Sequence, residues 1–301
     1  MYVPNEAQGK KKSFLSNLGE LAFLLLIVFL IRTFGFGLYQ VPTGSMETTM
    51  LVGERFFADK LSYLYRKPVR SEVIAFNDAN YKYSDNSLVY LFQQYVWGPA
   101  NWTKRVIGTP GDTVRGVIED SRAVVYVNGQ KLDEPYTNKY PLIRIAKDTS
   151  TRSRLLGEES SPKSFDPELP FDKQPFYRIN PAQVLLNADG SPSLIWPTEA
   201  RHFDEGQRYF ARREGRNYYN GTDEFLVELG DNQYWLMGDN RKGSYDSRAF
   251  GPVSGKLIHA RIIFRIWSID SNDSWVILDL LKHPIDFWTR IRFNRFFQWI
   301  S

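Results

Sequence analysis

Ser45 and Lys104 are the residues of this sequence whose types suit nucleophilic chemistry. A serine hydroxyl attacks a carbonyl only when a base takes its proton, and the usual base is histidine. The chain has no cysteine, and its three histidines lie far apart, outside any triad or metal-binding spacing. A neutral lysine is the available alternative. Because Gly44-Ser45-Met46 follows a long apolar segment, the pair suggests a peptidase beside a membrane.

Lys104 needs apolar surroundings to act as a base. The ordinary lysine pKa is ~10.4, and bringing it within about two units of neutral pH costs roughly 2 kcal/mol of differential solvation, which burial can supply. If residues 102–107 form a strand, Lys104 and Val106 share one face while Arg105 and Ile107 share the other. The arginine charge then points away from the amine.

Taken alone, each residue has an ordinary explanation. A serine after glycine is usually a turn residue, and Lys104 on its own reads as a surface lysine in a basic Lys-Arg pair. The interpretation as a dyad therefore depends on the motifs that accompany the two residues.

Residues 14–38 contain a candidate membrane span, with an unbroken apolar run from Leu21 to Ile31 between Glu20 and Arg32. With its apolar flanks the stretch approaches the ~20 residues needed to cross a bilayer, and charges at its edges can snorkel to the headgroups. The alternatives are a cleavable signal peptide and a buried core helix. Against cleavage, the residues directly after Arg32, Thr33 to Tyr39, contain no Ala-x-Ala site, so we expect an uncleaved anchor.

Lysines before the span predict its orientation. Lys10, Lys11 and Lys12 lie in the segment 1–13, which the positive-inside rule keeps in the cytoplasm. Everything after about residue 40 is then expected on the far side of the membrane.

The soluble part is predicted to be mainly β, with a core divided between residues 39–134 and 224–272. Short β-prone runs occur at 55–58, 72–76, 225–227 and 233–237, and 257–269 indicates a closing strand pair. Thr109-Pro110-Gly111-Asp112 is typical of a type II turn, and Val125-Tyr126-Val127-Asn128-Gly129 of a hairpin.

Two further segments differ in composition. Residues 135–223 are polar and weakly periodic, and we interpret them as an inserted subdomain. The tail, 273–301, mixes aromatic residues with Arg290, Arg292 and Arg295. Such a tail suits either a membrane interface with anionic lipid or a helix packed on the domain.

A third motif, Gly238 to Arg248, follows the serine motif and the Thr103–Asp112 motif in order along the chain. Together these motifs resemble those of bacterial type I signal (leader) peptidases. The resemblance covers roughly residues 20–130 and 225–270. It implies a LexA-like, β-rich catalytic core with one N-terminal transmembrane helix, which removes signal peptides from exported preproteins.

The resemblance also assigns roles to individual residues. It implies Ser45 as nucleophile and Lys104 as general base, with Thr43 as an oxyanion donor beside the Ser45 N–H and Ser244 orienting the lysine amine. The resemblance further implies that Asp239, Arg241, Asp246 and Arg248 support the structure of the site, with Asp246 and Arg248 forming an ion pair.

Partners and location follow from the same resemblance. The expected partners are preprotein signal peptides, the lipid bilayer and, by proximity, the export translocon, and no metal or organic cofactor is implied. The expected location is the bacterial inner membrane, single-pass, with the catalytic domain on the periplasmic side. A net charge of only +4 and the absence of a basic binding motif argue against a nucleic-acid partner.

This chain departs from the common pattern, and other readings compete. Ser45-Met46-Glu47-Thr48-Thr49 lacks the usual proline, Ser71-Glu72 replaces Gly-Asp, and Lys242-Gly243 replaces Asp-Asn, which bears on loop rigidity and substrate preference. The enzymatic alternatives are a narrow-specificity relative, such as a conjugation-type peptidase, or a self-cleaving repressor. The alternative of another class is a catalytically silent paralogue that binds signal peptides or scaffolds a secretion complex.

Overall fold

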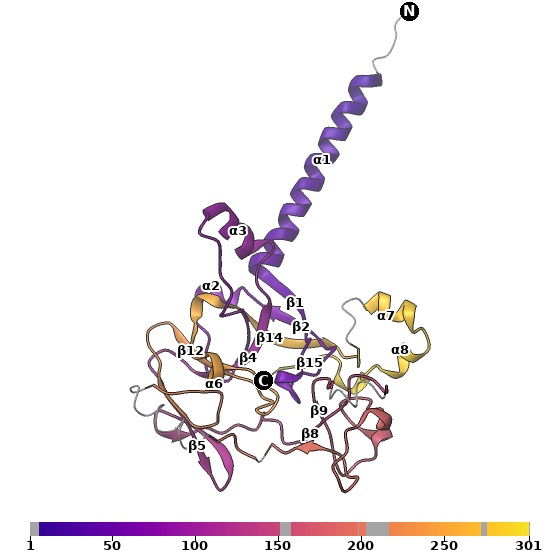
Figure 1. Ribbon diagram of the computed structural model, residues 1–301. Coiled ribbons are helices and arrows are strands. Elements are labelled where there is room, and N and C mark those ends of the chain that lie inside the picture. The colour runs from indigo at the N-terminus through magenta and orange to yellow at the C-terminus, as the bar shows by residue number, and fades with distance from the viewer. Residues whose placement is uncertain (1–5, 151–157, 198, 203–216, 272–275, 301) are drawn as a thin grey trace, which may run out of the picture.

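The computed structural model describes residues 6–150, 158–197, 199–202, 217–271 and 276–300 (Figure 1). Its strands form three antiparallel sheets, and one long helix stands away from them. The β-rich character predicted for the soluble part is therefore confirmed.

The long helix is α1 (Glu6–Leu30), which continues into a π-helical turn, η1 (Ile31–Gly35). The window Ser16–Gly35 has 20 residues, a mean hydropathy of 2.0 and only 6% of its residues buried. At 1.5 Å per residue this length matches the ~30 Å hydrocarbon thickness of a bilayer. The helical part ends short of the predicted limit at residue 38, because β1 begins at Phe36 and pairs with β2.

The largest sheet carries the strands that surround the candidate dyad. Its order is β1-β2-β14-β3-β4-β12-β13, with β15 also paired to β14. The strands are β1 (Phe36–Gln40), β2 (Arg55–Asp59), β3 (Val73–Asn77), β4 (Asn101–Gly108), β12 (Gln233–Met237), β13 (Val253–Ser254), β14 (Ile258–Trp267) and β15 (Gln298–Trp299). Short helices connect them: η2 (Gly44–Met46), α2 (Ser62–Tyr65), α3 (Ser87–Tyr95), α6 (Ser247–Phe250) and η5 (Gly255–Leu257).

One strand prediction in this sheet is wrong. Residues 257–269 do not form a closing pair, because β14 is a single ten-residue strand. It pairs with β3 through its first half and with β2 through its second, and the pairing register shifts along the way. The apolar stretch that the sequence analysis divides into two strands is thus one long strand, which pairs with two different neighbours in succession.

The second sheet has the order β11-β5-β6-β7, from β5 (Thr113–Glu119), β6 (Arg122–Val127), β7 (Gln130–Lys131) and β11 (Phe225–Glu228). Both predicted turns are present at its ends. Gly111 has φ +86° in the turn closed by the Asp112 N–H on the Thr109 carbonyl, as a type II turn requires. Asn128 and Gly129 both have positive φ between β6 and β7, as in a type I′ hairpin.

The segment 135–223 contains the third sheet, β10-β8-β9, and two short 3-10 turns. These elements are β8 (Leu142–Ile143), β9 (Lys163–Ser164), η3 (Phe171–Lys173), η4 (Pro181–Gln183) and β10 (Leu194–Ile195). Its apolar side chains form one cluster, which includes Ile143, Phe165 and Tyr177. Leu51, which lies outside the excursion between β1 and β2, belongs to the same cluster, so the excursion is packed onto the β-rich core.

The tail forms α7 (Val276–Lys282), α8 (Asp286–Thr289), η6 (Phe293–Arg295) and finally β15, which joins the main sheet. Its three arginines face carboxylates of the protein: Arg290–Asp279 at 2.7 Å, Arg292–Asp270 at 3.3 Å and Arg295–Glu54 at 2.6 Å. The tail is therefore packed on the domain. Its arginines are engaged in ion pairs, which disfavours the alternative that they bind anionic lipid.

Candidate active site

Lys104 lies in the middle of the main sheet. Its strand, β4, runs between β3 and β12, and Ile74 of β3 is directly opposite Lys104. The neighbouring residues alternate as predicted, since Val106 belongs to one apolar cluster and Ile107 to another. The Lys104 side chain is buried, with 5% of its surface exposed. Its amine is thus held among apolar strands rather than in water.

Ser45 is held in the short turn η2 between β1 and β2. Met46, the last residue of this turn, and Met50, which follows it, bury their side chains in the core. Asn240 fixes it from the other side, with its amide donating to the Gly44 carbonyl at 2.9 Å and its backbone N–H to the Ser45 carbonyl at 3.2 Å. The turn that carries the serine is therefore tied to the segment after β12.

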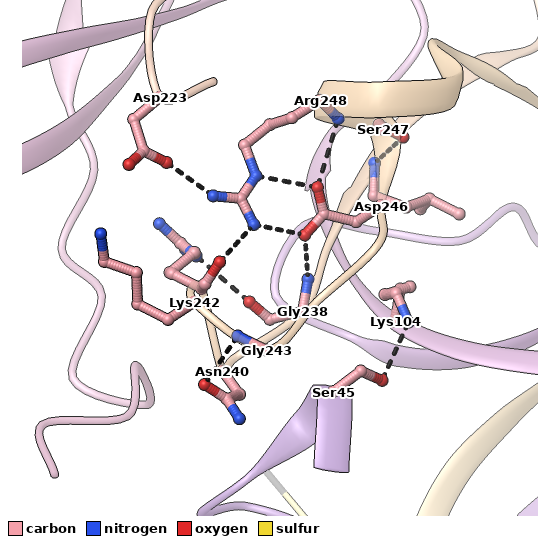
Figure 2. Close-up of polar contacts among 12 residues, drawn as sticks. Ser45, Lys104, Asp223, Gly238, Asn240, Lys242, Gly243, Asp246, Ser247 and Arg248 are labelled. Carbon is pink, nitrogen blue, oxygen red and sulfur yellow. Dashed lines mark hydrogen bonds and ion pairs between the residues drawn. The ribbon is translucent and has the colours of Figure 1, made fainter. Parts of the chain in front are cut away.

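The Lys104 Nζ and the Ser45 Oγ lie 2.9 Å apart and form a buried hydrogen bond (Figure 2). The amine also donates to the Thr103 carbonyl at 3.2 Å. Burial lowers the pKa of Lys104 from 10.5 to about 8, with Asp246 acting to raise it and Arg248 to lower it. A lysine with this pKa is deprotonated far more readily than a surface lysine, and its partner is a serine hydroxyl.

Asp246 and Arg248 form the expected ion pair behind the dyad. Two guanidinium nitrogens of Arg248 contact the Asp246 carboxylate at 2.8 Å each, and a third donates to Asp223 at 2.6 Å (Figure 2). Although burial raises it, the charge of Arg248 and hydrogen bonds from Arg248 and the Gly238 N–H bring the pKa of Asp246 down to about 2. Asp246 is thus ionised and fixes the strand end that faces Lys104.

The other two support residues brace neighbouring parts of the site. Asp239 accepts two hydrogen bonds from Arg105, at 2.9 and 2.8 Å, and one from Thr49 at 2.6 Å. Arg241 pairs with Glu134. Arg105 therefore points away from the Lys104 amine, as the strand alternation predicts, and links β4 to the segment that holds Ser45.

Ser244 lies beside the dyad but does not make the contact that the resemblance implies. Its Oγ is buried without a hydrogen-bond partner among the described residues, and the amine of Lys104 is directed instead to Ser45 and Thr103. Gly238 lets these groups approach: a Cβ on it would lie 2.3 Å from the Ser244 Oγ and 2.4 Å from the Ser45 carbonyl oxygen.

A cleft of about 1350 Å³ opens above the dyad and leads to the lower end of α1. One wall contains residues 36–46, among them the exposed Thr43, and the other contains residues 100–104. Val28 of α1 and Ile31 of η1 line the same cleft. Ser45 and Lys104 therefore line a cleft that extends to the membrane-span helix. Within the described ranges, no group of three His, Cys, Asp or Glu side chains is placed to hold a metal ion.

Sequence reasoning did not single out several residues that support the site. Asn240 lies within the third motif, so the motif could have identified it. Asp223 and Glu134 lie in no motif, so the sequence does not indicate their role. Glu47 is buried behind the serine turn and accepts hydrogen bonds from Ser164 and Tyr177 of the polar excursion. Burial raises the pKa of Glu47.

Comparison with known proteins shows which family the chain belongs to. The family described as signal peptidase, peptidase S26, matches residues 15–267, most of the chain. The chain belongs to the signal peptidase S26 family. Members of this family are serine peptidases, so the protein is a hydrolase of peptide bonds, and the resemblance stated from the motifs is confirmed.

Individual signal peptidases are distant relatives. Signal peptidase I of Buchnera aphidicola subsp. Acyrthosiphon pisum is 27% identical over 279 residues, 89% of this chain and 80% of that protein. Signal peptidase I of Rickettsia conorii is 26% identical over 325 residues, 99% of this chain and 97% of that protein. A crystal structure of a signal peptidase I from Enterococcus faecalis is 18% identical, with a TM-score of 0.28, and covers 65% of this chain and 97% of that one. The assignment rests on the family match.

Proposed function

We propose that this protein is a membrane-anchored endopeptidase that removes signal peptides from exported preproteins, with Ser45 as nucleophile and neutral Lys104 as general base. The observation that carries the proposal is the buried 2.9 Å contact between the two side chains at the floor of a cleft. With a pKa of about 8 for Lys104, roughly a tenth of the enzyme holds a neutral amine at pH 7.

In the acylation step, the Ser45 hydroxyl gives its proton to the Lys104 Nζ while its Oγ attacks the scissile carbonyl. The tetrahedral oxyanion receives hydrogen bonds from the Ser45 N–H and from Thr43, which stands exposed in the cleft two residues earlier. Such donors are typically worth ~3 kcal/mol each in the transition state. The lysinium then protonates the leaving amine, which departs as the N-terminus of the mature protein.

In the deacylation step, neutral Lys104 takes a proton from water while the water oxygen attacks the ester carbon. The bond from this carbon to the Ser45 Oγ then breaks, the lysinium returns the proton to Oγ, and the signal peptide leaves with a free carboxyl group. We assign the orientation of the amine to the Ser244 hydroxyl, which has no hydrogen-bond partner among the described residues and which Gly238 allows to lie near the serine turn. The ion pair of Asp246 with Arg248 holds the segment on which Ser244 lies. These residues therefore position the base without touching the substrate.

The substrate is an extended chain that lies in the cleft between residues 36–46 and 100–104. Small side chains at the residue before the cut and two residues earlier suit shallow pockets in such a cleft. A signal peptide that is itself held in the bilayer enters from the end near Val28 and Ile31. Tethering both molecules to one membrane raises their effective concentration.

The membrane anchor is α1, whose apolar side chains are exposed through most of the window Ser16–Gly35. Lys10, Lys11 and Lys12 keep the N-terminus in the cytoplasm, so the catalytic core faces the periplasm of a bacterial inner membrane, near the export translocon. Protease added outside intact spheroplasts is expected to degrade the catalytic core. Complete protection of the core would contradict this orientation.

Activity is tested with the full chain reconstituted in liposomes and a preprotein that carries a small-x-small site. Mass spectrometry of the product should show one cut directly after that site. The matched control is the same preprotein with valine in place of the small residue before the cut, which should remain intact. Cleavage of both substrates alike would contradict the proposed specificity.

A further inference from the structure

The helix α3 has an apolar surface that nothing in the described structure covers. It lies in the connection between β3 and β4, and residues 86–103 contain no charged side chain. Leu88 is 78% exposed and Trp97 80%, and α3 has no buried residue. An exposed apolar patch of this kind usually marks an interaction surface.

The position of α3 indicates which surface it meets. Figure 1 shows α3 projecting from the body on the side from which α1 leaves it. The rings of Tyr95 and Phe34 lie 5.9 Å apart, which places the end of α3 against the last turn of the span. If α1 crosses the membrane as proposed above, this turn lies at the headgroup level. Tyrosine and tryptophan, frequent in this segment, favour that level.

Beneath α3 lies a pocket of about 470 Å³ that contains three cationic side chains, Arg32, Lys60 and Lys256, and no acidic residue. Among the described residues, no carboxylate lies within ion-pair distance of any of these cations. The Lys60 amine instead donates to the Arg32 carbonyl at 2.6 Å. Trp97 and Tyr95 line the same pocket, so aromatic side chains lie beside the three cations there. Lys60 is half-buried, whereas Arg32 and Lys256 are exposed.

Among the residues that the structure describes, no acidic side chain lines the pocket to balance its positive charge. Burial and the nearby Arg32 charge both lower the pKa of Lys60, because each disfavours its protonated form. His259, which also lines the pocket, adds no charge at neutral pH, since burial lowers its pKa to about 4. A bound anion would offset this repulsion, and a phosphate at headgroup depth is an anion of suitable size and charge.

We propose that α3 lies in the outer interface of the bilayer and that the pocket formed by Arg32, Lys60 and Lys256 binds the phosphate of an anionic phospholipid. The acyl chains of this lipid extend past the apolar side chains of α3. The site is a second membrane contact that adjoins the active-site cleft, since Arg32 and Lys60 line both, and it holds the mouth of the cleft at a fixed height above the bilayer. It rests on the proposed span of α1.

Lipid selectivity tests the pocket. The full chain in detergent micelles is mixed with equal amounts of phosphatidylglycerol and phosphatidylcholine, and bound lipids are counted by native mass spectrometry. The wild type should retain phosphatidylglycerol, and Arg32→Gln and Lys256→Gln should each lower its affinity roughly fivefold. The control Lys67→Gln, an exposed lysine outside the pocket, should match the wild type.

Three results of this experiment would overturn the proposed lipid site. The first is equal retention of the two lipids by the wild type. The second is an equal loss of phosphatidylglycerol in the pocket variants and in Lys67→Gln. The third is displacement of phosphatidylglycerol by inorganic phosphate at the same concentration as the lipid, which would assign the site to a soluble anion instead.

Depth measurements test α3 separately from α1. Because the chain has no cysteine, Leu25→Cys, Leu91→Cys and Leu186→Cys each carry one fluorescent label in nanodiscs that contain nitroxide lipids. All three leucines are exposed, and Leu186 belongs to the excursion that contains β8. Figure 1 shows β8 on the side of the body opposite to α1. Quenching is expected at Leu25 and Leu91 and not at Leu186. Quenching at Leu25 alone would refute the α3 contact and leave the anchor intact, whereas no quenching at Leu25 would refute the anchor itself.

Discussion

The pH dependence of cleavage follows from the burial of Lys104. The fall of its pKa from 10.5 to about 8 corresponds to roughly 3 kcal/mol of differential stabilisation of the neutral amine. If the neutral amine is the base, kcat/KM for a peptide with a small-x-small site should follow the deprotonated fraction. It should rise about fivefold from pH 7 to pH 8 and less than twofold from pH 8 to pH 9.

The assay is steady-state cleavage of a fluorogenic peptide by the full chain in detergent micelles. The matched control is Lys104→Arg, which keeps the positive charge but cannot lose its proton, and so should be inactive at every pH. A wild-type midpoint near the ordinary lysine pKa of ~10.4, or a profile that is flat between pH 6 and pH 9, would refute the reasoning about burial. Equal activity in Lys104→Arg would refute its role as a base.

Two further predictions concern the residues that brace the site. Arg248→Met leaves buried Asp246 without its partner and should lower the free energy of unfolding by about 3–5 kcal/mol, measured by thermal unfolding. The control Arg144→Met, at an exposed ion pair, should lower it by at most about 1 kcal/mol. Equal losses in the two variants would contradict this. Gly238→Ala places a Cβ 2.4 Å from the Ser45 carbonyl oxygen, so it should reduce kcat more than it raises KM. It should also lower the free energy of unfolding by roughly 1–3 kcal/mol. A wild-type kcat in this variant would show that the close approach of Gly238 to Ser45 does not affect catalysis.

The sequence predicts the parts of this fold that depend on local patterns. The strand at 102–107 is predicted because its side chains alternate between two faces. The turns at 109–112 and 128–129 are predicted because glycine and asparagine adopt positive φ easily. Ser45 and Lys104 are identified because they lie in recognisable motifs. In the structure their side chains are in contact although the residues are 59 positions apart in the chain.

Contacts between distant segments have no such signal. Asp223 reaches Arg248 from the end of a polar excursion, and nothing in its local sequence distinguishes it from a surface carboxylate. Glu47 is bound by Ser164, 117 positions away, because both become buried only when the excursion packs on the core. The division of β14 between two neighbours likewise depends on where the other strands end, which periodicity does not encode.

The most direct test of the central claim is cleavage of a preprotein by detergent-purified wild type, Ser45→Ala and Lys104→Ala, with the new N-terminus of the product identified. Circular dichroism should first show that all three proteins are folded. The account predicts cleavage at the small-x-small site by the wild type and none by either variant. Cleavage by Ser45→Ala or Lys104→Ala at the wild-type rate would contradict the proposed dyad.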